Sequence, residues 1–395
     1  MTDLRPVFEL RTGAWTTRQR IEQTLDRQAT ALAVPNAIQA LVAQQQPDIL
    51  VNGALDSAEP WLIVNGRWAG VTAAQQMRQL PYATALIQQD GQLVGAHLPG
   101  DEAQSWARRP DLASLSDRIN IQRLEASVLL DRPWHILDNL DATLRTDLDA
   151  CDICPLDSLE RDALCFGDHP VAVAPDATLQ PKVVFNAQQG PIVVESEALI
   201  GAMAVLEGPC YIGRASQVAC HAHIRPHTVV GPVCKVAGEI SYSVIQGYTN
   251  KGHHGYLGHA LVGQWVNLGA ATNASNLKNT YGPIRMQLAA RTGAVDTGRM
   301  YLGPLIGDFV RTAIGSRLLT GCCVGTGAMI ALSCYGPKFI DRFRFLTDSG
   351  SHPYDTEKFL ATAQKMMARR NQPLLPAHRL RLIELAQSNR VSNAA

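Results

Sequence analysis

The densest group of side chains able to do chemistry lies in one stretch of the sequence, residues 250–278. Two runs compose it, NKGHHGYLGHA at 250–260 and VNLGAATNASNLK at 266–278. A histidine side chain accepts a proton near neutral pH, and an asparagine amide orients an amine or a carbonyl group. This stretch therefore predicts a site for proton transfer to or from a small polar substrate.

A second histidine group invites a metal interpretation. His221, His223 and His227 have the spacing H-x-H-x-x-x-H, and the first two share a face of any strand they lie on. Two histidines do not complete a tetrahedral zinc site. We favour polar residues on the outside of the fold and predict no metal site.

Two further pairs have weaker signals. Cys151 and Cys154 lack the second cysteine pair of a zinc ribbon, so we interpret them as structural. Asp101 and Glu102 could hold a divalent cation, but an acidic pair in PGDEAQ is more typical of a surface turn.

A six-residue repeat explains the architecture that must position the 250–278 stretch. An aliphatic residue returns at every sixth position in the series Val194, Ile200, Leu206, Ile212, Val218, Ile224, Val230 and Val236. This period fits neither an amphipathic helix nor an alternating strand. It is typical of a parallel β-helix, in which three six-residue sides close one coil around the aliphatic residues. We predict this coil over 169–335, with 269–304 as a loop ejected from it.

The segments on either side of the coil have other patterns. Before it, residues 1–168 alternate helical and apolar strand patterns, which is typical of an α/β domain. The strand patterns lie at 48–55, 60–66 and 82–98, and the helical patterns lie at 18–33 and 137–150. The tail, residues 336–395, predicts two helices, the first capped by Asp355.

Composition excludes several classes of protein. The 395 residues include 35 basic and 35 acidic side chains, and the resulting zero net charge excludes a generally basic nucleic-acid binder. No run approaches eighteen apolar residues, so we expect no membrane span. The nine cysteines are irregularly spaced, and the charged N-terminus lacks the apolar core of a signal peptide. These features predict a cytoplasmic protein with reduced thiols.

The motifs of the coil resemble those of a known family. The stretches at 250–284, 296–330 and 337–340, with MARR at 367–370, resemble the acetyltransferase half of the bifunctional UDP-N-acetylglucosamine pyrophosphorylase/glucosamine-1-phosphate N-acetyltransferases. A bacterial branch of sugar nucleotidyltransferases is closer still, and LRPVFELRTG and DILVNGAL in the first domain resemble it too.

The resemblance implies both a fold and an activity. The fold is a nucleotidyltransferase-like α/β domain lacking its first strand, then a left-handed parallel β-helix of hexapeptide repeats, then a helical tail. The activity is that of a transferase in nucleotide-sugar biosynthesis, which moves an acetyl group from acetyl-CoA to an amino-sugar 1-phosphate resembling glucosamine 1-phosphate.

Functional residues follow from the resemblance position by position. His253 matches the catalytic base, and Tyr256 matches a tyrosine that holds the sugar phosphate. Asn267 and Asn276 match asparagines that position the sugar and its amine, which makes Asn276 part of the catalytic set. Arg225 matches an arginine that contacts the sugar phosphate.

Three positions depart from the family pattern. Ser241 stands where the family has a phosphate-binding lysine, so Lys251 or Lys278 has to take that substrate-binding role. The aspartate of the family's YLGD motif is His259, which we interpret as structural. The serine that assists the oxyanion is Ile314.

Three functions stay open. The first is acetyl transfer. The second is nucleotidyl transfer to a sugar 1-phosphate, which needs Mg²⁺ and uses the β-helix for assembly. The first 150 residues contain no glycine-rich phosphate loop, so either further sequence precedes Met1 or this activity is lost. The third is a non-catalytic trimeric scaffold.

The resemblance also implies partners. We expect acyl-CoA beside the coils at 306–330, with Arg311, Arg317 and Lys338 on its phosphates. We expect a homotrimer, because three coils pack side by side in related acyltransferases and the loop at 269–304 needs a surface to cover it.

Overall fold

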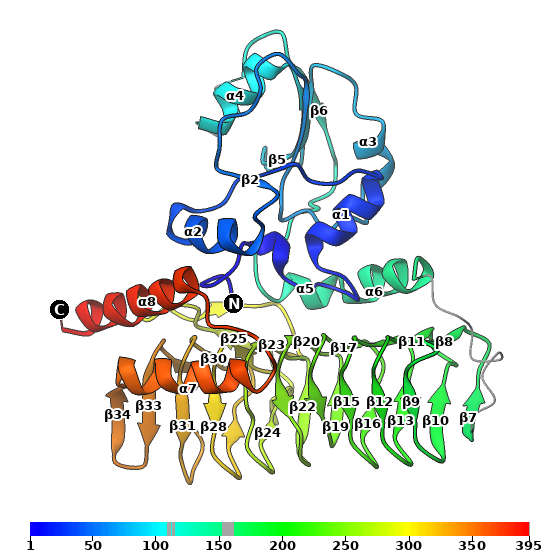
Figure 1. Ribbon diagram of the computed structural model, residues 1–395, viewed down its shortest axis with the longest axis vertical. Coiled ribbons are helices and arrows are strands. Elements are labelled where there is room, and N and C mark those ends of the chain that lie inside the picture. Colours follow the sequence, from blue (N-terminus) through cyan, green and yellow to red (C-terminus); the bar gives the residue numbers. More distant parts are fainter. Residues whose placement is uncertain (109–111, 113–114, 152–161, 395) are drawn as a thin grey trace. The chain divides into compact units, whose positions relative to one another are not determined.

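In the computed structural model the chain forms two compact units, whose elements are labelled in Figure 1. The N-terminal unit comprises residues 4–139 with Thr2, and the coil unit comprises residues 140–395 with Met1 and Asp3. The structure describes every residue except 109–111, 113–114, 152–161 and 395.

The N-terminal unit is an α/β domain around a four-stranded sheet. Its strands lie in the order β3-β5-β4-β6, with β4 and β6 parallel and the other neighbours antiparallel. Strands β1 and β2 form a separate parallel pair. The elements are η1 (Val7–Glu9), α1 (Thr17–Leu25), β1 (Ala31–Leu32), α2 (Asn36–Gln45), β2 (Leu50–Val51), β3 (Trp61–Val64), α3 (Ala74–Arg78), β4 (Thr84–Ile87), β5 (Leu93–Leu98), α4 (Gly100–Arg108), β6 (Asn120–Arg123) and α5 (His135–Asp138).

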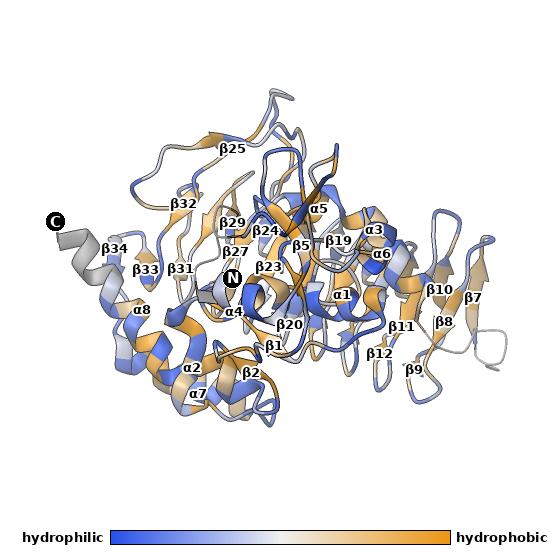
Figure 2. Ribbon diagram, turned by 90° about the horizontal axis from the view of Figure 1, so that it is seen from above, coloured by the Kyte–Doolittle hydropathy of each residue, from blue (hydrophilic) through white to orange (hydrophobic). Residues whose placement is uncertain are grey.

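Both faces of this sheet are buried. Leu86 of β4 packs with Trp68 and Met77 in one cluster, whereas Ala85 and Ile87 belong to another. Successive side chains of a strand point to opposite faces, so burial on both faces gives the continuous apolar runs seen in the sequence. Figure 2 shows β5 in the colour of hydrophobic residues.

The helix predicted at 18–33 is too long. Helix α1 begins at a capping box formed by Thr16 and Gln19, and it ends at Leu25 because Asp26 takes the left-handed backbone conformation, with φ 51°. The apolar residues after this point form β1 rather than a further helical turn. The strand patterns at 48–55, 60–66 and 82–98 are confirmed by β2, β3 and the β4–β5 hairpin.

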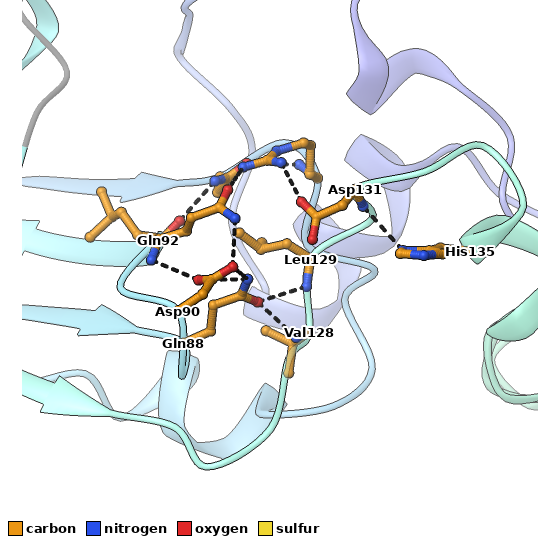
Figure 3. Close-up of polar contacts among 10 residues, drawn as sticks. Gln88, Asp90, Gln92, Val128, Leu129, Asp131 and His135 are labelled. Atoms are coloured by element: carbon orange, nitrogen blue, oxygen red, sulfur yellow. Dashed lines mark hydrogen bonds and ion pairs between the residues drawn. The ribbon is translucent and has the colours of Figure 1, made fainter. Parts of the chain in front are cut away.

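A buried glutamine fixes the turn of that hairpin (Figure 3). The Oε1 atom of Gln88 accepts hydrogen bonds from the backbone N–H groups of Val128 and Leu129, at 2.9 and 3.1 Å. Its Nε2 donates to the Asp90 carboxylate at 3.0 Å. These bonds satisfy backbone donors that the fold buries, so we assign the network a structural role.

The coil unit is a parallel β-helix with three sides, which we number. Side 1 is a nine-stranded sheet. Its strands are β8 (Val171–Val173), β11 (Ile192–Val194), β14 (Cys210–Ile212), β17 (Thr228–Val230), β20 (Val244–Gly247), β23 (Leu261–Gln264), β27 (Leu305–Ile306), β30 (Cys323–Val324) and β32 (Phe339–Ile340).

Sides 2 and 3 are interrupted where the long loop leaves the coil. Side 2 holds β9 (Thr178–Leu179), β12 (Leu199–Ile200), β15 (Gln217–Val218), β18 (Lys235–Val236) and β21 (Asn250–Lys251), then β28 (Arg311–Thr312), β31 (Met329–Ala331) and β33 (Arg344–Thr347), with β34 (Gly350–Pro353) antiparallel to β33. Side 3 holds β7 (Ala163–Phe166), β10 (Val183–Asn186), β13 (Val205–Glu207), β16 (His223–Ile224), β19 (Glu239–Ser241) and β22 (Tyr256–Gly258), then β24 (Asn273–Ala274) and β29 (Arg317–Leu318).

Strand register explains the six-residue period. Ile192 pairs with Cys210, and Cys210 pairs with Thr228, eighteen residues further along each time. Three sides of six residues close each of these coils, which is the geometry of the left-handed parallel β-helix. The eight aliphatic residues of the sequence series are each at most 1% exposed and form one core. The predicted fold class is confirmed in this part of the chain.

The long loop is shorter than the predicted 269–304. Residues 273–274 still belong to the coil, because β24 pairs in parallel with β29. The loop itself carries a small antiparallel hairpin, β25 (Arg285–Met286) and β26 (Val295–Asp296). It buries its own apolar residues, since Ile284 is 0% exposed and lies directly over Gly321.

The predicted helical tail is confirmed. Helix α7 (Thr356–Ala368) is capped by Asp355, whose side chain accepts from the Lys358 N–H at 2.8 Å, and α8 (Pro376–Ala394) follows. Phe359 of α7 packs against Phe309 at a corner of the coil, with ring centroids 5.9 Å apart. Helix α6 (Leu140–Asp149) is the remaining helix of the described coil unit.

Two further expectations concern cysteines and membranes. The eight cysteines in the described part of the chain are free thiols. Cys322 and Cys323 are both buried, and Cys322 belongs to the core of the coil. Among the described residues no helix combines the length and the hydropathy needed to cross a bilayer.

Candidate active site

The predicted catalytic histidine lies at one corner of the coil. His253 is exposed and sits in the turn between β21 on side 2 and β22 on side 3. Its ring has no hydrogen-bond partner among the residues that the structure describes. The side chain is therefore accessible to a substrate, while the backbone of its turn is held by a buried residue of the coil.

The anchor is Lys251, which is 2% exposed. Its Nζ donates to the backbone carbonyls of Ala237 and His253, at 2.8 and 2.7 Å. Burial lowers the pKa of the Lys251 ammonium to about 8. Since its ammonium group is inside and bonded to two carbonyls, Lys251 holds the His253 turn in place and does not present its charge to solvent.

Side 3 brings together two predicted residues, Tyr256 and Asn276. The Nδ2 group of Asn276 donates to the Tyr256 hydroxyl at 2.9 Å and contacts Nδ1 of His259 at 2.8 Å. The cluster packs tightly over Gly258, where an added Cβ would lie 2.1 Å from the Tyr256 hydroxyl. Burial raises the pKa of the Tyr256 phenol, which keeps it neutral. His259, interpreted as structural from the sequence, thus belongs to the same cluster as Asn276.

A column of aromatic rings holds His259 at the opposite corner of side 3. The His259 ring stacks on Tyr242, with centroids 4.8 Å apart and planes 6° apart, and on Tyr301 at 5.2 Å. The column continues through His227, which contacts Tyr242 at 4.7 Å and pairs with Asp141 of α6 at 2.7 Å. One such residue comes from each coil because this corner repeats once per coil. Spacing alone did not predict the column, since shortened coils break the six-residue register here.

The remaining polar residues of side 3 lie beside Tyr256. Glu239 is the direct strand partner of Tyr256, and it pairs with Arg225 at 3.0 Å. The Arg225 guanidinium is nearly half exposed, so it remains accessible to an anion. Ser241, at the position of the family's lysine, is the strand partner of Gly258, over which the Tyr256 hydroxyl lies.

Two predicted residues do not join this cluster. Asn267 lies on side 2, where its Oδ1 accepts from Asn250 Nδ2 at 3.1 Å and its backbone bridges to Arg311. Lys278 follows Asn276, but its Nζ donates to the Pro283 carbonyl of the long loop at 2.8 Å. His253 stands at the corner between Asn267 on one side and Tyr256 on the other.

The three basic residues predicted to bind acyl-CoA also lie apart. Arg311 is on side 2, where it donates to the Tyr354 hydroxyl at 2.6 Å. Arg317 is exposed on side 3, and the central carbon of its guanidinium group lies 5.6 Å from the centre of the Tyr335 ring. Lys338 is exposed and immediately precedes the side 1 strand β32.

The residues considered as metal ligands contact other side chains or do not gather into one group. His223 lies 3.5 Å from Glu207, and within the described ranges no group of three His, Cys, Asp or Glu side chains could hold a metal ion. Asp101 and Glu102 open helix α4, and both bond to Arg118 at 3.1 Å. This pair therefore does not fit a magnesium site. Cys154 lies outside the described residues.

The N-terminal unit contains a cavity of about 2040 Å³. Arginines line part of it, among them Arg5 and Arg67, and the indoles of Trp61 and Trp106 line another part. Arginine and aromatic side chains together suit a ligand that carries phosphate and a flat ring. No sequence motif predicts this cavity, because its lining comes from many short segments.

Comparisons with known proteins agree with the resemblance seen in the motifs. Residues 1–152 match the family model described as sugar nucleotidyl transferase. A bifunctional sugar-1-phosphate nucleotidylyltransferase/acetyltransferase of Sulfurisphaera tokodaii is 31% identical over 36% of this chain and 35% of its own length. A bifunctional protein GlmU of Jannaschia sp. is 36% identical over 36% of this chain and 31% of its own. The chain thus matches about a third of the length of these relatives, and the resemblance is confirmed.

Solved structures give weaker likenesses. The acetyltransferase domain of PglB from Neisseria gonorrhoeae, in complex with acetyl coenzyme A, is 12% identical over 69% of this chain and 100% of its own, with a TM-score of 0.17. PerB from Caulobacter crescentus, in complex with CoA and GDP-perosamine, is 12% identical over 47% of this chain and 57% of its own, with a TM-score of 0.15. At such scores the chemistry has to be argued from this chain's own residues.

Proposed function

We propose that the coil unit is an acyltransferase of the cytoplasm that moves an acetyl group from acetyl-CoA to the amine of an amino-sugar 1-phosphate. The observation that carries the proposal is the cluster on side 3, where Asn276 bonds to Tyr256 at 2.9 Å between the corners that hold His253 and His259. The bifunctional relatives, named for nucleotidylyl and acetyl transfer, support this class of reaction.

In the proposed reaction His253 is the general base. The attacking amine is the neutral form, which has already released one proton to water. As its nitrogen bonds to the thioester carbonyl carbon, the imidazole of His253 takes a second proton from it. The C–S bond then breaks, and the imidazolium gives this proton to the departing thiolate of coenzyme A. The free side chain of His253 and the fixed backbone of its turn suit this role.

Neighbouring groups bind and orient the substrates. Asn276 holds the amine near the thioester, and Tyr256 with Arg225 contacts the sugar phosphate. Asn267 lies on side 2 and contacts the sugar next to the turn that carries His253. A backbone N–H of the neighbouring coil stabilises the oxyanion, because Ile314, which is 79% exposed, has no side-chain donor.

We also propose a homotrimer with acyl-CoA bound beside the later coils. The long loop buries its own Ile284, so it does not need a neighbouring subunit to cover that residue. The trimer is supported by other large apolar side chains that are exposed on a single chain: Tyr281, Ile314 and Tyr335. Arg311, Arg317 and Lys338 supply charge for the phosphates. A monomer mass by light scattering at micromolar protein concentration would contradict the trimer. If calorimetry detects no binding of acetyl-CoA at millimolar concentration, the proposed acyl-CoA site is wrong.

The activity is tested by thiol release from acetyl-CoA. The full chain is incubated with a panel of amino-sugar 1-phosphates, and each amino sugar is matched by the same sugar with a hydroxyl in place of the amine. We expect thiol release with at least one amino sugar and none with its hydroxyl counterpart. Equal release from both members of every pair contradicts the proposal.

A second candidate function rests on the cavity in the N-terminal unit. Its arginines and indoles suit a nucleoside triphosphate, as nucleotidyl transfer to a sugar 1-phosphate requires. Because Trp61 and Trp106 line the cavity, a nucleotide there should change tryptophan fluorescence. Titration with UTP and Mg²⁺ tests this, and unchanged fluorescence up to millimolar UTP contradicts it.

A further inference from the structure

His259 occupies a position that the proposed mechanism does not use, yet it contacts the residue that holds the amine. Its Nδ1 lies 2.8 Å from Asn276 Nδ2, and the same Nδ2 group donates to the Tyr256 hydroxyl at 2.9 Å. Both protons of the Asn276 amide are therefore directed at fixed acceptors. Asn276 Oδ1 then points away from them, and it has no hydrogen-bond partner within the described part of the chain.

The orientation of this amide matters for an amine substrate. An amide oxygen accepts a hydrogen bond from an amine or an ammonium group. An amide N–H can only donate, so it has nothing to accept it on an ammonium group, and on a neutral amine it engages the lone pair that must attack the thioester. An Asn276 side chain turned by half a rotation would present Nδ2 to the substrate. The amide has nearly the same shape in both orientations, so only its hydrogen-bond partners select between them.

His259 can make this selection because its ring is fixed and neutral. The ring is clamped between Tyr242 at 4.8 Å and Tyr301 at 5.2 Å, so it cannot turn away from Asn276. Burial, with a smaller contribution from His227, lowers the pKa of His259 to about 4. A neutral imidazole that accepts at Nδ1 carries its proton on Nε2.

We propose that His259 is a positioning residue that fixes the orientation of the Asn276 amide and so presents Asn276 Oδ1 to the amine of the acceptor substrate. This inference rests on the proposed acetyl transfer and deepens it, because it makes the site selective for a hydrogen-bond donor on the substrate. The ring stack holds His259, and His259 holds Asn276.

Two substitutions distinguish the effect of losing the hydrogen-bond acceptor of His259 from the effect of losing its aromatic ring. His259→Phe keeps an aromatic ring between Tyr242 and Tyr301 but removes the acceptor. His259→Asp removes the ring but keeps an acceptor, because its Oδ atoms are bonded to Cγ just as Nδ1 is in histidine. We expect His259→Phe to lower kcat/KM for the amino sugar at least tenfold, with KM for acetyl-CoA unchanged. We expect His259→Asp to stay within about threefold of the wild type, because it keeps an acceptor for the Asn276 N–H. The larger loss in His259→Phe follows because the Asn276 N–H is left without its acceptor.

His227→Phe is the matched control. His227 belongs to the same ring column and contacts Tyr242 at 4.7 Å, but its polar contact is with Asp141 rather than with Asn276. It should leave kcat/KM for the amino sugar unchanged. If His259→Phe keeps wild-type kcat/KM, or if His259→Asp loses as much as His259→Phe, the acceptor atom is not what matters and the inference is wrong.

A spectroscopic measurement tests the same inference without activity. Nitrogen NMR of histidine-labelled wild-type protein distinguishes a bare Nδ1 from a protonated one. We expect His259, assigned by its absence in His259→Phe, to have a bare Nδ1 and a protonated Nε2 at pH 7. The opposite tautomer overturns the inference. If His259→Phe fails to fold, the signal that is missing from His259→Asp gives the same assignment. If the wild-type chain shows no acetyl transfer, the proposed function is contradicted. The NMR measurement still decides whether His259 accepts at Nδ1, because it does not depend on activity.

Discussion

Replacement of the buried Lys251 by methionine should change the pH dependence of stability in a way that no surface lysine can. Lys251 is 2% exposed, and its pKa is lowered by burial from 10.5 to about 8. Between these two values the unfolded chain binds more protons than the folded chain. The free energy of unfolding contributed by Lys251 therefore rises with pH across this window.

The size of the effect follows from the pKa difference. At about 1.4 kcal/mol for each unit of pKa, a buried charged ammonium costs up to about 3 kcal/mol below pH 8. That cost is removed as the pH passes 10.5. Lys251→Met lacks both the charge and the hydrogen bonds to Ala237 and His253, each worth about 1.5–3 kcal/mol. At pH 7 the two effects largely cancel. At high pH the wild-type side chain is a neutral amine, so its charge no longer costs stability, and the variant lacks only its neutral hydrogen bonds, each worth about 0.5–1.5 kcal/mol.

The assay is urea unfolding of wild type and Lys251→Met at several pH values from 7 to above 10. We expect the wild type to gain stability over the variant by up to about 3 kcal/mol between pH 8 and 10.5. Lys182→Met, which removes an exposed lysine paired with Asp162, controls for loss of a surface charge. Parallel curves for wild type and Lys251→Met would refute the reasoning, because they would mean that the ammonium is not buried.

Two further predictions concern the coil unit. Asp3 bonds to Thr326 and Arg342; although burial alone would raise its pKa, the N-terminal ammonium and Arg342 hold it below 3.8. Asp3→Asn should therefore destabilise the chain by about 1–3 kcal/mol at pH 7, and the difference should shrink as the pH falls below 3.8, which unfolding at pH 7 and pH 3 checks. Gly321→Ala places a Cβ 2.4 Å from Ile284 and should loosen the long loop, measured as faster proteolysis there. Gly315→Ala has a similar φ but open space around it, so equal cleavage in both variants contradicts the packing.

The sequence predicts the core of the coil better than its corners. Val194 and Ile200 are buried as the six-residue period requires, because an aliphatic residue has no other favourable place in such a coil. The period is lost where coils shorten: Val229 pairs with Val244, fifteen residues on rather than eighteen. From there the position of each corner residue depends on turn geometry that spacing does not encode.

The site shows the same limit. Tyr256 and Asn276, two of the residues that the resemblance selects, bond to each other, whereas Asn267, a third, lies on another side of the coil. Lys251 was expected to bind phosphate, and its ammonium instead bonds to two carbonyls inside the coil. A lysine in a polar stretch gives no sign of which way it points. His259 likewise gains its contact with Asn276 only from the fold.

The most direct test of the proposed acetyl transfer is turnover of His253→Ala on the best amino-sugar substrate. General-base catalysis typically contributes about 10²–10⁴-fold, so kcat should fall by about two orders of magnitude or more while acetyl-CoA affinity stays unchanged. His254→Ala, the exposed neighbour in the same turn, is the matched control and should cost far less. Near-wild-type turnover in His253→Ala would contradict the account.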